Sequence, residues 1–329
     1  MKTVKKACVF IGMVVGAGFA SGREIADYFL VFGENWKIGI AFSGLLFFLV
    51  IAATIGVVER TGAKSYKKYL LSIMGDRLAI FTEWVSGIFF FVMFFAMTAA
   101  SGSAATEMFR IDSRIGIAFT LIVCASVIYK GMDALELISV ALVPLLVAGI
   151  ALIGAKCGTG EIVSAPKCGS VILSAVIYVS YNTITAASVT AYSEEKQGNG
   201  LLTGALCGLA MTIMGYIIGY AVLSKGAIDA EIPFAFAAKA LGGAYFFIYA
   251  IVFCSAVLTT AICDGVAAVA FVREKLKIGK GLAICMLIAA AAVFSVVRFS
   301  DFVSKIYPIF GFVGVLQLLS VFSFYIRRK

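Results

Sequence analysis

Apolar residues dominate ten long segments of the chain, and short polar stretches separate each segment from the next. A hydrocarbon core about 30 Å thick is crossed by a helix of roughly 20 apolar residues. The pattern therefore predicts an all-α integral membrane protein with ten transmembrane helices, at residues 4–32, 37–58, 78–108, 115–130, 134–155, 168–192, 200–224, 244–272, 280–297 and 302–326. Connections are short and contain no Pro-, Ser- or charge-rich linker, so we expect one transmembrane domain over residues 1–329.

The first predicted helix is interrupted by a glycine-rich stretch at residues 16–22 and resumes with the charged residues Arg23, Glu24 and Asp27. In lipid, each backbone N–H or C=O group without a partner costs several kcal/mol, so protein or a water-filled cavity must cover such a break. The break also frees carbonyls before it and N–H groups after it. Membrane proteins use such groups to hold a cation beside an anionic group. The break therefore indicates a binding site at the membrane midplane.

The sixth predicted helix has a comparable polar interruption, Tyr178 to Thr185, although no glycine lies within it. Spans one and six are equivalent positions of two five-helix halves, and halves with an odd number of helices have opposite orientations in the membrane. Paired interruptions in equivalent spans are typical of inverted-repeat transporters. We therefore expect a 5+5 inverted repeat, with residues 1–155 and 156–329 as its halves and with spans 1 and 6 broken at the midplane.

Composition supports a membrane protein, because 62% of the residues are hydrophobic and the mean hydropathy is +1.05. The net charge of +9 has a simple source in basic loops on one side of the membrane. With ten spans, most of the 27 Lys and Arg residues fall on the side of the two termini. The positive-inside rule then predicts a multi-pass protein of the plasma membrane with both termini cytoplasmic.

The chain contains no histidine, which excludes histidine metal sites and catalytic triads that depend on histidine. Its eight cysteines form no CxxC pair. Cys157 and Cys168 fall in one predicted loop, where a disulfide is one possibility that spacing alone does not establish. Without a catalytic constellation, we expect neither an enzyme nor an organic cofactor.

Ten spans with breaks in the first and sixth resemble the LeuT-like fold of the amino acid–polyamine–organocation transporter superfamily. Within the first span, the string VGAGFASGRE at residues 15–24 resembles the opening motif of YkvI-like bacterial membrane proteins. This resemblance implies a secondary active transporter that works by alternating access, in which two helix bundles move about a site at the midplane.

The resemblance also implies a sodium ion as the coupling ion. Sodium-coupled members hold the ion between carbonyls of the broken first span and a carbonyl plus two adjacent hydroxyls of span eight. The matching positions in this sequence are Gly12, Val15, Ala256, Thr259 and Thr260. Hydroxyls and freed carbonyls supply the oxygens that a hard cation prefers. The alternative is that the two threonines bond carbonyls of their own or a neighbouring helix.

Two further observations bear on the coupling ion. Some relatives replace sodium by a lysine of span five and couple to protons, but residues 134–155 contain no lysine. Asp264 lies one helical turn after Thr260, where it would attract the cation or carry a proton. A hydrogen bond or ion pair with a neighbouring helix is the alternative for Asp264.

Charged residues near the span ends are expected to take part in gating. On the outer side these are Arg23 and either Glu24 or Asp27, with Asp301 or Arg298 as opposite partners. A solvated helix end is the alternative for this group.

On the inner side, relatives place an acidic gate residue at the position of Glu274. Lys5 or Lys6 is its expected partner. A loop salt bridge that contributes little to stability is the alternative.

The substrate is expected between the two breaks, with backbone N–H groups of the second half-helix available to a carboxylate. No acidic residue is expected at either break, which argues against a polyamine and favours a small zwitterionic solute such as an amino acid. The expected lining residues are Gly16, Ala17, Gly18, Phe19, Ala20, Ser21, Met93, Met97, Tyr178, Ser180, Tyr181, Asn182 and Thr183. Besides the small molecule, the lipid bilayer is the expected partner, and nucleic acid is not.

Two alternative functions stay open at this stage. One is a proton-coupled carrier that uses Asp264 or Glu24. The other is a receptor of the same fold that binds a small molecule without transporting it.

Overall fold

The computed structural model describes residues 2–158, 169–192, 198–230, 232–294 and 302–327, and the described chain is almost entirely helical. Within these ranges, eight helices are long and apolar enough to cross a membrane. They are α4 (Trp36–Thr61), α6 (Asp76–Phe109), α7 (Ser113–Lys130), α8 (Met132–Cys157), α9 (Val171–Tyr192), α10 (Gly200–Ser224), α12 (Gly243–Leu276) and α15 (Tyr307–Arg327). Large apolar side chains such as Ile122 and Leu137 face outward, as contact with lipid requires.

The first and ninth expected spans correspond to shorter helices. The first contains α1 (Lys2–Val14), and the ninth contains α13 (Lys280–Phe294). Residues 295–297, which complete the ninth expected span, lie outside the described residues, as does Cys168. The count of ten spans therefore stays a prediction.

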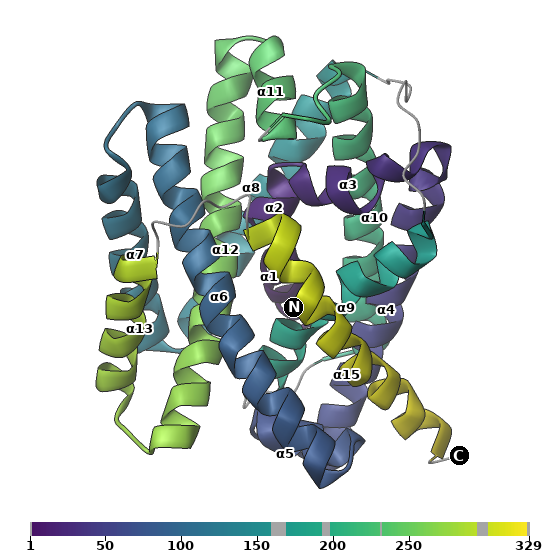
Figure 1. Ribbon diagram of the computed structural model, residues 1–329, viewed down its shortest axis with the longest axis vertical. Helices are drawn as coiled ribbons and strands as arrows, with labels where there is room; N and C mark the ends of the chain where they lie inside the picture. The colour runs from purple at the N-terminus through teal and green to yellow at the C-terminus, as the bar shows by residue number, and fades with distance from the viewer. Residues whose placement is uncertain (1, 159–168, 193–197, 231, 295–301, 328–329) are drawn as a thin grey trace.

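The glycine-rich break in the first span is present. After α1, the backbone of Gly16 is extended, and the chain continues as the short helices α2 (Ala17–Ala20) and α3 (Arg23–Tyr28). Gly22 between them has φ +79°, a conformation that favours glycine. In Figure 1, α3 runs across the direction of the long helices before η1 (Leu30–Asn35) leads into α4.

The expected break in the sixth span is absent, because α9 is one continuous helix through residues 178–185. Its polar side chains bond carbonyls of their own helix and so support the helix instead of opening it. Ser180 Oγ donates to the Val176 carbonyl at 2.6 Å, and Asn182 Nδ2 donates to the Tyr178 carbonyl at 2.9 Å. No residue of this stretch is a glycine or proline that would disrupt the helix.

Glycines bring the long helices into close contact. A Cβ atom on Gly208 of α10 would collide with the Gly44 carbonyl of α4, and one on Gly314 of α15 would lie 2.6 Å from the Ser180 carbonyl carbon. Small residues at such crossings are a common basis of helix association in lipid.

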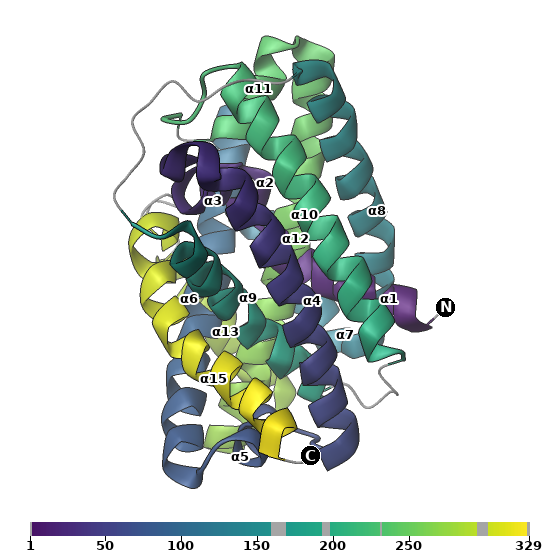
Figure 2. The same ribbon diagram turned by 90° about the vertical axis from the view of Figure 1, so that its right-hand side faces the viewer.

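Two short helices lie at opposite ends of the bundle, with α5 (Tyr66–Ile73) at one end and α11 (Pro233–Ala240) at the other (Figures 1 and 2). Tyr66 of α5 donates a hydrogen bond to Gln317 Oε1 of α15 at 2.6 Å. At the other end, the Phe234 N–H of α11 donates to the Ser21 carbonyl at 2.7 Å. These bonds attach α5 to α15 and α11 to the bend between α2 and α3.

Candidate functional site

The end of α1 meets α12 at Thr260. The Thr260 hydroxyl lies 2.9 Å from the Gly12 carbonyl oxygen and 3.2 Å from that of Met13. The Gly12 carbonyl is available because the Gly16 N–H donates to Val14 instead of closing another helical turn. A Cβ atom on Gly16 would lie only 3.0 Å from Thr260 Oγ1, so glycine at this position permits the close approach.

The neighbouring hydroxyl, that of Thr259, bonds its own helix. Its Oγ1 lies 3.0 Å from the Ser255 carbonyl oxygen and 3.1 Å from that of Ala256. Its side chain still packs on α1, because a Cβ atom on Gly12 would lie 3.2 Å from Thr259 Cβ. The structure therefore brings together Gly12, Thr259 and Thr260 of the expected sodium site, and adds the Met13 carbonyl. Val15 and Ala256 are fully buried.

Asp264 follows one turn further along α12 and is only 1% exposed. Its Oδ1 atom accepts a hydrogen bond from Thr185 of α9 at 2.8 Å. Its Oδ2 atom is buried and has no hydrogen-bond partner in the described part of the chain. A hydrogen bond to a neighbouring helix, one of the two alternatives for this residue, is thus present.

Glu24 does not point outward as expected but folds back onto α2. A Cβ atom on Gly18 would lie 2.6 Å from the Glu24 Cδ atom, so the carboxyl group occupies the space that the glycine leaves. The residue is only 3% exposed. This placement corrects the expectation that no acidic residue lies at a break. The physical reason is the bend at Ser21 and Gly22, which turns the start of α3 back toward the glycine-rich stretch.

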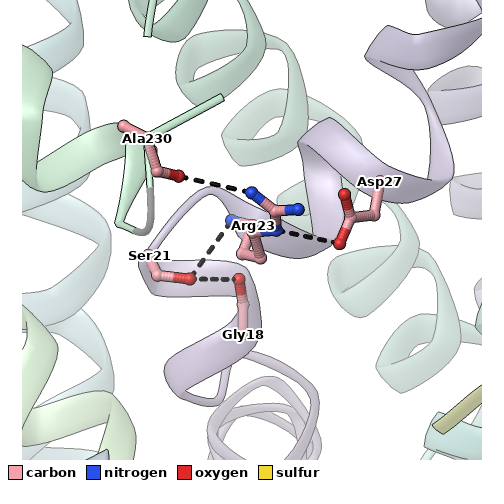
Figure 3. A network of polar contacts seen from close by, with 5 residues as sticks. All are labelled: Gly18, Ser21, Arg23, Asp27 and Ala230. Carbon is pink, nitrogen blue, oxygen red and sulfur yellow. Dashed lines mark hydrogen bonds and ion pairs between the residues drawn. The ribbon is translucent and has the colours of Figure 1, made fainter. Parts of the chain in front are cut away.

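The Arg23 side chain reaches Asp27 and Ala230 (Figure 3). Its Nε atom donates to Asp27 at 2.9 Å, and its Nη1 atom donates to the Ala230 carbonyl at 3.3 Å. Ser21 holds the bend, since its hydroxyl donates to the Gly18 carbonyl at 2.8 Å and accepts the Arg23 N–H at 3.1 Å. The Ser21 hydroxyl thus acts as both donor and acceptor within the bend. The expected gate partners Arg298 and Asp301 lie outside the described residues.

Four tyrosines gather beside Glu24. Tyr28 of α3 lies with its ring centroid 5.5 Å from that of Tyr178 and 5.9 Å from that of Tyr181. The Tyr181 ring lies 5.3 Å from that of Tyr307 of α15. We call Tyr28, Tyr178, Tyr181 and Tyr307 the tyrosine cluster. All four hydroxyl oxygens are buried and lack a hydrogen-bond partner among the described residues.

The remaining expected pocket residues have structural contacts. Ser180 packs against Gly314 of α15, and Thr183 donates to the Ser180 carbonyl at 2.9 Å. Met93 and Met97 are buried in α6. From α6, the residue whose ring lies near the tyrosine cluster is Phe89, at 6.4 Å from Tyr181, which the sequence did not single out.

The expected pairing of Lys6 with Glu274 is wrong. Lys6 of α1 forms a buried ion pair with Glu136 of α8 at 2.5 Å. Glu274 instead accepts a hydrogen bond from the Tyr192 hydroxyl at 3.3 Å. The neighbouring Lys275 pairs with Glu83 at 2.6 Å. Sequence separation hides such pairs, because Lys6 and Glu136 are 130 positions apart.

A cavity of about 520 Å³ opens beside this ion pair. Its wall includes Glu136, and its other charged lining residues are Lys64, Asp133, Arg273 and Lys280. These residues belong to the side of the protein that the basic loops predict to be cytoplasmic. We call this cavity the charged vestibule. The Lys6–Glu136 pair therefore lies between the charged vestibule and the α1 segment that leads to the break.

No protein-family model matches the chain. Two proteins of Bacillus subtilis strain 168 are similar to it. The uncharacterized membrane protein YkvI is 26% identical over 324 residues, which cover 94% of this chain and 92% of YkvI. The uncharacterized protein YyaD is 21% identical over 334 residues, which cover 99% of this chain and 98% of YyaD.

Solved structures with the same fold include two proteins with bound small molecules. Mhp1, a nucleobase-cation-symport-1 family transporter in a closed conformation with bromovinylhydantoin, has a TM-score of 0.68 at 11% identity. The match covers 92% of this chain and 74% of Mhp1. MhsT in complex with L-phenylalanine has a TM-score of 0.65 at 12% identity, over 98% of both chains.

The chain is therefore a multi-pass membrane protein with the LeuT-like fold of membrane transporters. In sequence it is a homologue of the membrane protein YkvI, as the motif at residues 15–24 suggested. The proteins that it resembles in these comparisons are membrane proteins and transporters and not enzymes, in agreement with the expectation from its sequence.

Proposed function

We propose that this protein is a secondary active transporter that carries a small organic solute by alternating access. The observation that carries the proposal is the contact between the broken first span and α12, where Thr260 reaches the carbonyl of Gly12. A break that exposes backbone oxygens inside a membrane bundle provides a site at mid-depth. Mhp1 and MhsT, which share the fold, have a hydantoin and an amino acid bound.

Sodium is the coupling ion that this contact favours. In this structure the Thr260 hydroxyl donates its hydrogen to the carbonyl oxygens of Gly12 and Met13, so a partial positive charge lies among the three oxygens. A sodium ion in the same place would bind these oxygens directly once the hydroxyl turned its hydrogen away. Neutral oxygens are suitable ligands for such a cation. Because ion and solute favour the same conformations in this mechanism, each tightens the binding of the other.

The Lys6–Glu136 ion pair serves as the inner gate in this proposal. It joins α1 to α8 beside the charged vestibule, and the extended backbone at Gly16 is the joint about which α1 moves. Opening the site toward the vestibule would separate the two charges. The small-molecule substrate that we propose is an amino acid or a similar solute.

A proton-coupled carrier is the second candidate function, and Asp264 is the observation that favours it. This carboxyl group is buried one turn from Thr260, and one of its oxygens has no hydrogen-bond partner among the described residues. A carboxyl group in that situation is suited to bind and release a proton. A receptor of the same fold would bind the small molecule without accumulating it.

Equilibrium binding of ²²Na⁺ to the purified protein in detergent tests the coupling ion. The informative variant is Thr260→Val, which removes the hydroxyl and keeps the shape. Thr98→Val is the matched control, because Thr98 is equally buried and its hydroxyl bonds only carbonyls of its own helix. We expect saturable binding to the wild type and to Thr98→Val, and at least about tenfold weaker binding to Thr260→Val, a loss of about 1.4 kcal/mol. Equal binding to all three proteins, or none to the wild type, would exclude sodium at Thr260.

A further inference from the structure

Glu24 is a buried carboxylate at the break whose charge has no evident use in the sodium site. It is 3% exposed, and its Oε2 atom has no hydrogen-bond partner in the described chain. Burial of an ionised carboxylate is costly unless a positive group or hydrogen bonds compensate it. The position of Glu24 against Gly18 therefore calls for compensation by a proton, by hydrogen-bond donors or by a positively charged ligand.

The basic residue adjacent in sequence does not supply this compensation. Arg23 extends toward Asp27 and the Ala230 carbonyl (Figure 3) and forms its ion pair with Asp27. Glu24 and Asp27 both follow the break, but their surroundings differ. Asp27 is paired and partly exposed, whereas Glu24 is buried.

The surroundings of Glu24 are aromatic. The tyrosine cluster brings together rings from three elements, α3, α9 and α15, and the hydroxyls of Tyr178 and Tyr181 lie within reach of the Glu24 carboxyl group. Phenol oxygens accept hydrogen bonds from N–H groups, and aromatic faces attract organic cations. Tyrosine hydroxyls and rings around one buried carboxyl group match the needs of a group that carries both a positive charge and N–H donors.

We infer that Glu24 and the tyrosine cluster form the binding site for an organic ammonium group, so that the substrate carries a protonated amine. This inference rests on the proposed transport function and names its substrate class. The carboxylate neutralises the ammonium, while tyrosine oxygens and ring faces replace its hydration shell. The expectation of a zwitterionic solute also required a helix start for a carboxylate, and α2 has only four residues.

In this structure the rings contact one another, so the cluster must open to admit an amine. Its α3 part has joints on both sides, at Gly22 with φ +79° and at Phe29, whose backbone is not helical. Movement of α3 on these joints would separate Tyr28 from the rings of α9. Closure of the same rings around the ammonium group would exclude water.

Thermal unfolding of the purified full-length protein tests this inference. The probes are methylamine, n-butylamine, phenethylamine and tetramethylammonium, each titrated in sodium and in potassium buffer. Uncharged matches are n-butanol and 2-phenylethanol, and L-phenylalanine is the zwitterion. A ligand that binds only the folded protein raises the unfolding temperature in a saturable manner. We expect at least one amine to do so and its alcohol to have no effect.

Variants identify the site. Glu24→Gln keeps the size of the side chain and removes its charge, and we expect at least about tenfold weaker amine binding, or about 1.4 kcal/mol. Asp27→Asn, the matched control, should bind like the wild type. Tyr181→Phe keeps the ring and removes the hydroxyl, and should weaken binding severalfold without abolishing it.

Each outcome decides the inference. Absence of stabilisation by the three amines and by tetramethylammonium overturns it, as does equal amine binding by Glu24→Gln and the wild type. If Glu24→Gln is itself more stable and no amine binds, the compensating ligand is a proton and the inference fails. Amine binding that depends on Glu24 in a protein that binds no ²²Na⁺ would uphold the inference and contradict sodium coupling.

Discussion

Thr260 and Gly12 lie 248 positions apart, and the hydroxyl of the first donates a hydrogen bond to the carbonyl of the second at 2.9 Å. This bond joins the end of α1 to the middle of α12, where α1 stops being helical. The extended backbone at Gly16 leaves the Gly12 carbonyl free. The missing Cβ atom of Gly16 lets the Thr260 hydroxyl approach this carbonyl closely.

Gly16→Ala should weaken sodium binding. The added Cβ atom would lie 3.0 Å from Thr260 Oγ1, so Thr260 must shift by a few tenths of an ångström away from the Gly12 carbonyl. We expect severalfold weaker ²²Na⁺ binding with an intact fold. Gly75→Ala is the control, because nothing lies within 4 Å of a Cβ atom there. An unchanged affinity in Gly16→Ala would show that this close approach does not contribute to the ion site.

Removing one member of the Lys6–Glu136 pair should destabilise the protein. Each side chain is at least 89% buried, and loss of Lys6 takes this cation from the Glu136 carboxylate. Lys6→Met should cost about 3–5 kcal/mol, and the double variant Lys6→Met/Glu136→Leu should cost less than the sum of the two single variants. Unfolding by SDS in mixed micelles measures these differences. Additive costs in the double variant would contradict a direct interaction.

Gly314→Ala should destabilise the contact between α15 and α9. The new Cβ atom would lie 2.6 Å from the Ser180 carbonyl carbon, a backbone atom that cannot move by side-chain rotation. Overpacking of this kind costs about 1–3 kcal/mol. Gly279→Ala, which meets nothing within 4 Å, should leave the unfolding temperature unchanged. Equal unfolding temperatures for both variants would contradict the close packing.

The variant Asp264→Asn distinguishes sodium coupling from proton coupling. The amide oxygen can still accept the Thr185 hydroxyl, so the fold should persist. If sodium is the coupling ion, ²²Na⁺ binding changes only a few-fold. If the proton is the coupling ion, uptake driven by a pH gradient disappears in the variant. Loss of sodium binding with an intact fold would instead place Asp264 in the sodium site itself.

Much of the architecture follows from the sequence. Apolar length predicts the long helices, and the glycine-rich string at residues 15–24 predicts where the first span breaks. The LeuT-like fold expected from these features is confirmed by its likeness to Mhp1 and MhsT. Thr260 reaches the broken span, and both threonine hydroxyls bond carbonyls of their own or a neighbouring helix, which is the alternative given for this pair. The sodium site itself stays a prediction.

Other features depend on tertiary geometry. A hydroxyl-rich stretch such as residues 178–185 is compatible with an open or a closed helix, and in α9 the side chains bond their own helix. The direction of the Glu24 side chain depends on the bend at Ser21 and Gly22. A helix assumed to continue through the break would place this side chain wrongly. The partner of Lys6 lies on another helix, where no local pattern identifies it.

Uptake into proteoliposomes tests the central claim, sodium-coupled transport, most directly. The purified protein is reconstituted, and accumulation of radiolabelled phenethylamine, methylamine and L-phenylalanine is followed with an inward sodium gradient, with potassium in its place, and with a pH gradient alone. We predict that at least one of these solutes accumulates above its outside concentration only with the sodium gradient, and that Thr260→Val abolishes this while Thr98→Val does not. Accumulation that is equal in sodium and potassium, or no accumulation of any of the three solutes, would contradict it.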